Sequence, residues 1–411
     1  MKRNLFYFTD VYPFGRGEAT FVEPEIEYLS RFYDVTVVSL GYGQDERNNN
    51  LKSEILKKIN LIKCDQKQFL LRIVFLIIFP FSKIAREECK RIVKSNKMRF
   101  KRILKVGFSY SRGRALQIQF RKNGIFDKKD TSCYYTFWFN DSLLACSFEQ
   151  HKNPKESMNL ITRIHGYDLY KDRTSFFWQS FQQFKANCAR QIIFLTNKAQ
   201  RYFQENYSIV STKASVCALG TAKAPSIPSK ENNSMFRIVS CSNVVPLKRL
   251  KLLVQSLALL SDLQIEWIHF GEGEQFKEVK SLAMHCNINA HFYGHVSHQA
   301  LYSFYSNNYI DVFVTVSSSE GLPVSIEEAL AFGIPIIGTD VGGISEEIQG
   351  NGILLSANPS AQDVADAIRW IYNASDDEIL RMRATSYDLW STRYNIENSL
   401  KRLKEIVEKE Y

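Results

Sequence analysis

Three glutamates lie close together in the second half of the chain and could offer oxygen acceptors to a ligand. They are Glu320, Glu327 and Glu328, in the stretch SSSEGLPVSIEEA. Ionised carboxylates only accept hydrogen bonds, so they suit a ligand that carries many hydroxyl groups. The surrounding run from Gln299 to Ile368 contains no Lys, Arg or His, although the chain has a formal net charge of +10. Any cation that serves the same site must come from another part of the sequence.

The pattern around these glutamates places them on two different elements. DVFVTVSSSE is typical of a strand followed by a loop, and GLPVSIEEALAFG of a helix that starts near Pro323 and stops at Gly333. We therefore expect Glu320 in the loop and Glu328 in the second helical turn, where both can face one cleft. Glu327 is expected to complement the helix dipole or to be structural.

Candidate cations and a glycine pair stand on either side of this motif. Lys248 and Arg249 follow the predicted strand FRIVSCSNV. Taken alone they indicate a charged helix start, but cations are unfavourable at a helix N-terminus, and a phosphate between them would remove that conflict. Gly342 and Gly343, in GTDVGGISEEI, predict a place where the backbone closely approaches another group.

The first half contains a glycine loop and a histidine at predicted strand ends. YPFGRGEATF places Gly15 and Gly17 between a strand and a helix, where backbone N–H groups can face a phosphate. TRIHGYDLY places His165 beside Gly166 at the end of another strand. A solitary histidine is more often structural, but ligands of open α/β sheets collect at the carboxyl ends of the strands. We therefore keep His165 as a candidate.

IHFGEGEQF offers a second glycine turn, Gly271-x-Gly273. It could be part of a dinucleotide fingerprint, but Phe276 stands where that fingerprint has its third glycine. The alternative interpretation is a turn that lines a nucleotide cleft.

Strands and helices alternate in both halves of the chain, which predicts two doubly wound α/β domains. TAKAPSIPSKENNSM, residues 221–235, has the composition of a linker between them. The predicted organisation is a first domain over 1–220, a second over 236–385, and helices over 386–411. These last helices can pack back onto the first domain.

Composition bears on the compartment. The eight cysteines occur singly and without histidines at zinc-ligand spacing, which indicates free thiols in a reducing compartment and no metal site. The segment MKRNLFYFTD does not have the apolar run of a secretory signal. We expect a cytoplasmic protein.

The excess positive charge is concentrated in one region. Between Lys52 and Lys122 there are 20 Lys or Arg and 4 Asp or Glu. The apolar run FLLRIVFLIIFPF, residues 69–81, is shorter than the roughly 20 residues that cross a bilayer. Residues 69–122 can therefore rest on anionic lipid head groups, or form a buried helix followed by a solvated basic one. Nucleic acid is a third option, but no nucleic-acid module accompanies the patch, and we expect none to bind.

The motif from Glu320 to Glu328 resembles the Glu-x7-Glu signature of the retaining, nucleotide-sugar-dependent glycosyltransferases of family 4. The following segment ALAFGIPIIGTDVGGISEEI is similar to that family's next strand and glycine turn. The resemblance implies the GT-B fold, in which two Rossmann-like domains face each other across a cleft. It also implies that Glu320 contacts hydroxyls of the donor sugar and Glu328 the ribose.

Other residues acquire expected roles from the same resemblance. Lys248 falls on the family's phosphate-binding lysine, whereas the family's arginine falls on Asn243, so Arg249 is a candidate substitute. Gly15 and Gly17 match the loop that faces the diphosphate, and His165 matches a histidine near the donor sugar. The remaining expected donor contacts are Gly271, Gly321, Leu322, Pro323, His295 and Val296.

The resemblance implies transfer of a sugar from a nucleoside diphosphate to an acceptor hydroxyl with retained anomeric configuration. It implies no cofactor and no metal, and no Asp-x-Asp motif is present. In the branch that builds bacterial capsule, lipopolysaccharide or exopolysaccharide, the acceptor is a saccharide or a lipid-linked saccharide. A peripheral position on the membrane, through residues 69–122, would suit that acceptor. The alternatives are a GT-B-fold nucleotide-sugar epimerase and a non-catalytic nucleotide-sugar-binding protein.

Overall fold

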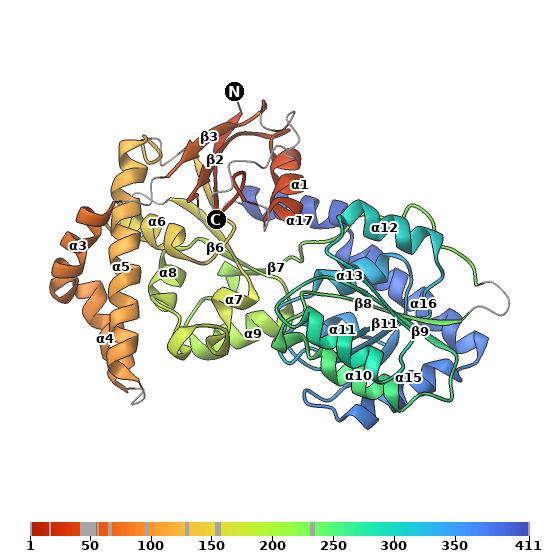
Figure 1. The fold of residues 1–411 in the computed structure, drawn as a ribbon. Helices are drawn as coiled ribbons and strands as arrows, with labels where there is room; N and C mark the ends of the chain where they lie inside the picture. The colour runs from red at the N-terminus through yellow and green to blue at the C-terminus, as the bar shows by residue number, and fades with distance from the viewer. Residues whose placement is uncertain are drawn as a thin grey trace. The chain divides into compact units, whose positions relative to one another are not determined.

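The computed structural model describes most of the chain as two compact units. The first unit consists of Met1–Cys217 with Arg402–Tyr411, and the second of Ala218–Lys401. Figure 1 shows the elements of each unit. The described residues are 2–15, 18–41, 55, 57–64, 68–94, 98–127, 131–152, 158–230 and 235–409.

The first unit is built on a seven-stranded sheet with the order β3-β2-β1-β4-β5-β6-β7, in which every pair of neighbours is parallel. Its central strands are almost entirely buried, as expected for a parallel sheet that helices cover on both faces. The direction of the strand order reverses between β1 and β4, which makes their carboxyl ends a topological switch point. The strands are β1 (Arg3–Thr9), β2 (Tyr33–Ser39), β3 (Asn60–Lys63), β4 (Cys133–Thr136), β5 (Asn159–Ile164), β6 (Gln191–Phe194) and β7 (Ala214–Val216).

Helices surround this sheet, and on one side they form a second layer. The long helix α5 packs on α6, and α3 and α4 pack in turn on α5, on its side away from the sheet in Figure 1. The helices are α1 (Ala19–Leu29), α3 (Phe69–Ile78), the 3-10 turn η1 (Phe79–Phe81), α4 (Lys83–Lys94), α5 (Arg99–Lys122), α6 (Asp141–Lys152), α7 (Gly166–Leu169), α8 (Gln182–Cys188) and α9 (Asn197–Asn206). No described helix is long and apolar enough to span a membrane.

The second unit repeats the plan with a six-stranded parallel sheet of order β10-β9-β8-β11-β12-β13. Its switch point lies between β8 and β11. The strands are β8 (Phe236–Cys241), β9 (Ile265–Phe270), β10 (Ala290–Gly294), β11 (Val312–Thr315), β12 (Ile336–Thr339) and β13 (Gly352–Leu355). The helices are α10 (Leu250–Ala258), α11 (Phe276–His285), α12 (His298–Asn307), α13 (Val324–Ala331), α14 (Ile344–Glu347), α15 (Ala361–Tyr372) and α16 (Asp376–Leu389).

The C-terminal segment connects the two units a second time. After α16 a π-helical turn over Trp390–Tyr394 leads into α17 (Ile396–Glu408). The first residues of α17 belong to the second unit, and those from Arg402 onward belong to the first. The side chains of Leu403, Ile406 and Val407 are buried. The end of the chain therefore returns to the N-terminal unit, which the sequence left open.

Candidate functional site

Lys248 and Glu320 meet at the switch point of the second sheet. Lys248 ends the 3-10 turn that follows β8, and Glu320 lies in the loop that follows β11, the strand beside β8. Their Nζ and Oε1 atoms are 2.5 Å apart, and the two side chains are 20% and 9% exposed. Because β8 and β11 pair, the fold brings together a cation and a carboxylate that are far apart in sequence. A pair this sheltered is screened only weakly by salt.

Glu328 lies on α13 and has a different partner. Its Oε1 atom is 3.1 Å from Nε2 of His298, the first residue of α12. The Cys241 thiol, at the end of β8, is close to both halves of the site. Burial, together with the Glu328 carboxylate, raises its pKa to about 12, although Lys248 acts to lower it. Glu328 and Lys248 therefore act on the same small region at the carboxyl edge of the sheet.

His298 is not among the donor contacts predicted from the sequence, although it begins the helix after β10. The predicted contacts in the preceding loop are His295, which is exposed, and Val296, which is partly buried. The preceding residue Ser297 caps α12 by accepting a hydrogen bond from the amide of Ala300. An N-cap serine followed by a histidine near a strand end was the available signal.

Two glycines let loops approach each other where a side chain could not fit. Gly342 has a φ of +55°, and a Cβ atom there would lie 1.8 Å from the carbonyl oxygen of Glu320. The next amide, that of Gly343, donates to the carbonyl of Gly321 at 2.6 Å. The close approach predicted from the glycine pair is thus made to the backbone that carries Glu320. Gly271, with a φ of +130°, similarly abuts the carbonyl of Ser242 after β8.

Arg249 holds the loops of this edge together. It occupies a left-handed conformation, with a φ of 50°, at the start of α10. Its guanidinium donates to the carbonyl oxygens of Val316 at 2.5 Å, Ser317 at 2.8 Å and Ala357 at 2.9 Å, and to Oδ1 of Asn358 at 3.1 Å. A guanidinium has five N–H donors, so these contacts occupy most of them. They support a positioning role, and phosphate binding by Arg249 stays a prediction.

Two further glutamates are fully buried behind the site, Glu327 in the first turn of α13 and Glu347 in α14. Burial raises the pKa of Glu347 well above its usual range, and the carboxylates of Glu327 and Glu320 raise it further. The three carboxylates thus lie near one another, and Glu320 is the one that pairs with Lys248.

At the switch point of the first sheet, a carboxylate occupies the loop after β1. Glu18 accepts hydrogen bonds from the amides of Asp10 at 3.1 Å, Val11 at 2.8 Å and Tyr12 at 2.9 Å. It also accepts one from Nε1 of Trp138, which follows β4. Glu18 thus supplies the negative charge for which a nest of backbone amides is suited.

The glycine loop expected to face a phosphate follows directly. The amides of Phe14 and Gly15 donate to the carbonyl of Val11 at 2.7 and 2.8 Å. Gly17 lies outside the described residues. Phosphate binding by Gly15 stays a prediction, and it would require the Gly15 amide to exchange its partner.

Asp10 is a candidate that the sequence pattern did not bring forward, although it ends the first predicted strand. Its Oδ1 atom accepts a hydrogen bond from Nδ2 of Asn140 at 2.5 Å. Burial, together with the nearby Glu18 carboxylate, raises the pKa of Asp10 to about 8. Its place after β1 at the switch point was the signal that could have identified it.

His165 follows β5 at the same edge of the first sheet. Its ring lies 4.3 Å from that of Trp138 and 4.7 Å from that of Phe137, measured between centroids. Within the described part of the chain, neither ring nitrogen has a hydrogen-bond partner. Burial lowers the pKa of His165 well below its usual range, and Arg163 lowers it further. The imidazole is therefore neutral and suited to a hydroxyl, not to an anion.

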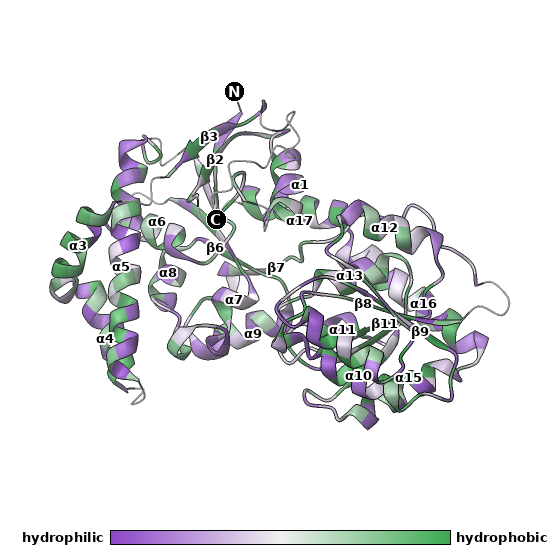
Figure 2. Cartoon of the chain, in the orientation of Figure 1, coloured by the Kyte–Doolittle hydropathy of each residue, from purple (hydrophilic) through white to green (hydrophobic). Residues whose placement is uncertain are grey.

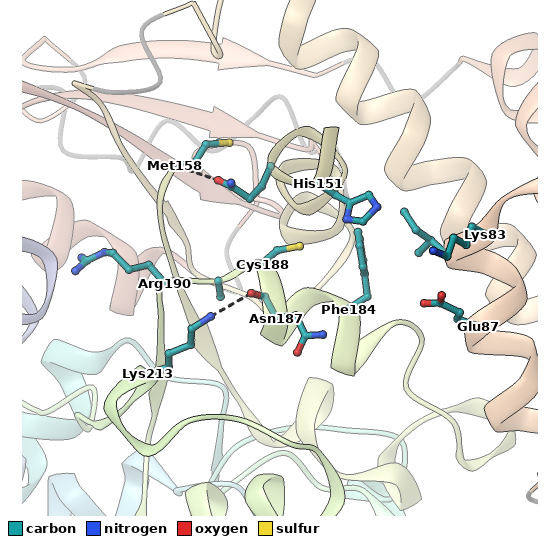
Figure 3. A pocket seen from close by; sticks show the side chains of 12 residues that line it. Lys83, Glu87, His151, Met158, Phe184, Asn187, Cys188, Arg190 and Lys213 are labelled. Atoms are coloured by element: carbon teal, nitrogen blue, oxygen red, sulfur yellow. Dashed lines mark hydrogen bonds between the residues drawn. The ribbon is translucent and has the colours of Figure 1, made fainter. Parts of the chain in front are cut away.

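A cavity of about 510 Å³ in the first unit lies away from these residues. Figure 3 shows its lining, with the His151 ring beside Phe184 and the Lys213 ammonium on the Asn187 carbonyl at 3.1 Å. Lys213 directly precedes β7, so the cavity opens at the amino ends of the strands. It is therefore not part of the candidate site at the carboxyl edge.

Solved structures share the fold over nearly the whole chain. Anabaena Alr3699/HepE in complex with UDP aligns with a TM-score of 0.68 at 14% identity, over 98% of this chain and 99% of that one. The lipopolysaccharide outer core galactosyltransferase WaaB, in its apo form, aligns with a TM-score of 0.65 at 13% identity over 98% and 99%. At these identities the likeness concerns the fold alone. The expected α/β class is confirmed: the two parallel-sheet, Rossmann-like units have the GT-B fold.

Sequence relatives add a family to that fold. Residues 226–387 match the family model for glycosyl transferases group 1. The O-antigen biosynthesis glycosyltransferase WbnH of Escherichia coli is 32% identical over 132 residues, which are 32% of this chain and 37% of that protein. The putative teichuronic acid biosynthesis glycosyltransferase TuaC of Bacillus subtilis (strain 168) is 48% identical over 58 residues, 14% of this chain and 15% of that one. The residues that match the glycosyl transferases group 1 model lie within the second unit, and they include Lys248, Glu320 and Glu328.

Proposed function

We propose that this protein is a retaining glycosyltransferase of the family 4 type, which moves a sugar from a nucleoside-diphosphate sugar to an acceptor hydroxyl. The observation that carries the proposal is the sheltered Lys248–Glu320 pair at the switch point of a sheet that matches glycosyl transferases group 1. The relatives named as glycosyltransferases support it, as does the HepE structure with UDP.

The ion pair suggests how the donor is received. A diphosphate brings negative charge to Lys248, and the lysine then exchanges the Glu320 carboxylate for a phosphate oxygen. Glu320, released from its cation, can accept hydrogen bonds from hydroxyls of the sugar. Glu328, which His298 holds at 3.1 Å, is the group proposed for the ribose hydroxyls. Recognition of the diphosphate by Lys248 and of the sugar by Glu320 thus rests on one exchange of partners.

The chemical step is proposed to be mainly electrostatic. The bond between the anomeric carbon and the diphosphate oxygen breaks, and the acceptor oxygen forms the new bond on the same face of the sugar. Lys248 stabilises the charge that develops on the departing diphosphate, which takes the acceptor's proton. The neutral His165 is suited to a sugar hydroxyl. No metal is invoked in this scheme.

We further propose a saccharide or lipid-linked saccharide acceptor and a role in bacterial surface-polysaccharide synthesis. The names of the Escherichia coli and Bacillus subtilis relatives support this assignment. A lipid-linked acceptor would require a cytoplasmic enzyme to work at the membrane surface, for which residues 69–122 are the proposed contact.

The test is incubation with a panel of nucleotide sugars, following release of nucleoside diphosphate with and without saccharide acceptors. Lys248→Ala should lower kcat by about 100- to 1000-fold, because one preorganised group at the developing charge is lost. Glu320→Ala should lower kcat/KM comparably, because the sugar is no longer held in place. Both variants should keep the wild-type circular dichroism spectrum.

Matched controls come from α10 and α11. Lys251 and Glu278 form an exposed ion pair at 2.6 Å, so Lys251→Ala and Glu278→Ala should leave release unchanged. Stable donor binding without release for every donor and acceptor would instead favour a binding protein. Conversion of the donor to an isomeric nucleotide sugar, without release, would favour an epimerase.

A further inference from the structure

Helix α3 presents an apolar surface that the rest of its unit does not cover. None of its ten residues is buried, although nine of them are apolar. Leu70 is 79% exposed and Phe69 is 70% exposed, and Phe81 in the adjoining turn is 78% exposed. Figure 2 shows α3 in hydrophobic colouring over most of its length. Single exposed apolar residues are ordinary, but a continuous apolar helix face usually marks a binding surface.

The helix is nevertheless firmly placed. Phe79 is buried with Phe75 partly buried beside it, in a cluster that includes Tyr110 of α5. A methyl group at Gly107 of α5 would lie 3.6 Å from Leu76 and 3.7 Å from Phe79, which is ordinary van der Waals contact. One face of α3 is thus anchored on α5, and the other is held outward. We call the exposed large apolar side chains of α3 and η1 the α3 wedge; they are Phe69, Leu70, Ile73, Val74, Ile77, Ile78 and Phe81.

A second apolar line runs along α5 beside the wedge. Phe100, Leu104 and Phe108 are 73%, 45% and 46% exposed and follow one another at four-residue intervals, which places them on one face of the helix. Phe108 directly follows Gly107, the residue that lies against α3. The exposed apolar area therefore continues from α3 onto α5.

Positive charge surrounds this surface. Helices α3, α4 and α5 with η1 contain 14 Lys or Arg and 2 Glu. In α4 the buried residues Ala85, Glu88 and Ile92 face inward, so that the cations Arg86, Lys90, Arg91 and Lys94 are exposed. Glu88 is occupied by hydrogen bonds from Nε1 of Trp178 and the amide of Phe181. Arg112 and Arg121 of α5 are offset by Asp141 and Glu149 of α6, so the exposed cations of α4 carry the positive charge beside the wedge.

The exposed apolar surface and the cations beside it together indicate what binds to the α3 wedge. A second copy of the chain would bring the same cations against these ones, which repels. An anionic bilayer offers both complements, acyl chains for the wedge and phosphate head groups for α4. With ten residues, α3 is about 15 Å long against a hydrocarbon core of about 30 Å, so it can lie in the interface but not cross it.

We propose that the α3 wedge inserts into one leaflet of an anionic phospholipid bilayer, with the cations of α4 on the head groups. Membrane insertion deepens the proposed function, because it would bring the enzyme to a lipid-linked acceptor, and only this purpose rests on the proposed function. Insertion itself requires neither donor nor acceptor. The apolar side chains of the wedge retain the protein on the membrane, and the cations of α4 provide the initial attraction.

The test is flotation of the full-length protein with vesicles of phosphatidylcholine and phosphatidylglycerol. Leu70→Ser/Ile77→Ser/Phe81→Ser should weaken partitioning by about 100-fold or more, because three exposed apolar side chains no longer enter the acyl region. The matched control is Val210→Ser/Met284→Ser/Leu380→Ser, whose side chains are 63%, 69% and 64% exposed elsewhere, and which should bind as wild type does. Lys90→Glu/Arg91→Glu/Lys94→Glu should bind less, and pure phosphatidylcholine should bind little.

A second measurement reports insertion in a protein whose wedge is otherwise intact. The fluorescence that Leu70→Trp adds to that of the five native tryptophans should be quenched by brominated acyl chains, and the fluorescence that Val210→Trp adds should not. Release of nucleoside diphosphate with a soluble acceptor should be unchanged in the serine variant, which separates failure of the wedge from failure of the proposed function. Wild-type binding by the serine variant would overturn the proposal. A concentration-dependent dimer that the serine substitutions abolish would also overturn it, by assigning the wedge to a second copy.

Discussion

Single candidate residues in both units are held by partners that a ligand would have to replace. Lys248 is paired with Glu320, Asp10 with Asn140, and the amides of the β1 loop with Glu18. Buried charges and amides are costly without partners, so in the absence of ligand the chain supplies them itself. Ligand binding at such a site is an exchange of partners and not the filling of an empty space.

The titration of Asp10 leads to a prediction at this scale. Its pKa of about 8 in the fold lies above its ordinary value of 3.8, because burial and Glu18, then Asp141 and Asp168, disfavour its charge. The folded state therefore binds the proton more tightly than the unfolded state. This contribution to stability is fully present below about pH 4 and is lost as pH rises to about 8.

Asp10→Asn imitates the protonated form and should remove this dependence. The wild-type melting temperature should fall relative to that of the variant as pH rises from about 4 to about 8, and the two should be close at pH 4. Thermal unfolding at pH 4, 6 and 8 measures the difference. A difference that does not change with pH would show that Asp10 is not protonated in the fold.

At the scale of elements, the site depends on loops that touch through their backbones. The loop after β12 reaches the loop after β11 at Gly342, and Arg249 ties the loops after β11 and β13 to the start of α10. The carboxylate of Glu320 is positioned by these contacts and not by a helix or strand of its own. A substitution that disturbs these backbone contacts should therefore displace Glu320, even when no candidate side chain is itself changed.

Gly342→Ala tests that dependence. The new Cβ would lie 1.8 Å from the Glu320 carbonyl, so the loop must move, at a cost of about 1–3 kcal/mol in folding free energy. Displacing Glu320 by about 1 Å should lower nucleoside diphosphate release by about 100-fold. Urea unfolding and the release assay measure the two effects.

Gly350→Ala is the control for this variant. Gly350 also has a positive φ, +87°, but a Cβ atom there would have no neighbour within 4 Å. It should cost about 1–2 kcal/mol from backbone strain and leave release unchanged. Equal loss of release in both variants would show that backbone strain, and not the contact with Glu320, is responsible.

At the scale of the whole molecule, α17 returns the chain to the N-terminal unit, and its C-terminal end contacts Arg190. Its guanidinium donates to the carbonyls of Lys409, Ile406 at 3.3 Å and Val407 at 3.3 Å, and to Oδ1 of Asn159 at 2.5 Å. The last carbonyls of α17 have no partners within the helix, so a cation there satisfies them. Arg190 thus fastens the end of α17 to the N-terminal unit.

Arg190→Ala should release this fastening and cost about 1.5–3 kcal/mol, the range for hydrogen bonds from a charged group. Hydrogen exchange of residues 402–409 should accelerate, while exchange in the second sheet stays unchanged. The control Arg402→Ala removes an exposed pair with Glu405 at 3.0 Å and should cost less than about 1 kcal/mol. Unchanged exchange at 402–409 in Arg190→Ala would mean that burial of Leu403 and Ile406 suffices.

Much of the fold was readable because its signals are local. The strand-loop-helix order and the positions of β1, β2, β8, β9 and β11 follow from apolar runs that end in glycine or polar loops. The start of α13 and its stop at Gly333 follow from Pro323 and the glycine. The edge strands β3 and β13 were missed because each has only four residues and little buried surface, so neither shows a clear period.

The sequence by itself determined the candidate carboxylates, the candidate cation and the α/β plan, because residue type and spacing along one element are local properties. Only the tertiary structure decided which of them meet. Lys248 reaches Glu320 because β8 pairs with β11, Arg249 is committed to loops more than sixty residues away, and Glu18 takes the amides of its own loop. Such contacts depend on strand order and on competition among hydrogen-bond and ion-pair partners, and the spacing of residues along the chain predicts neither.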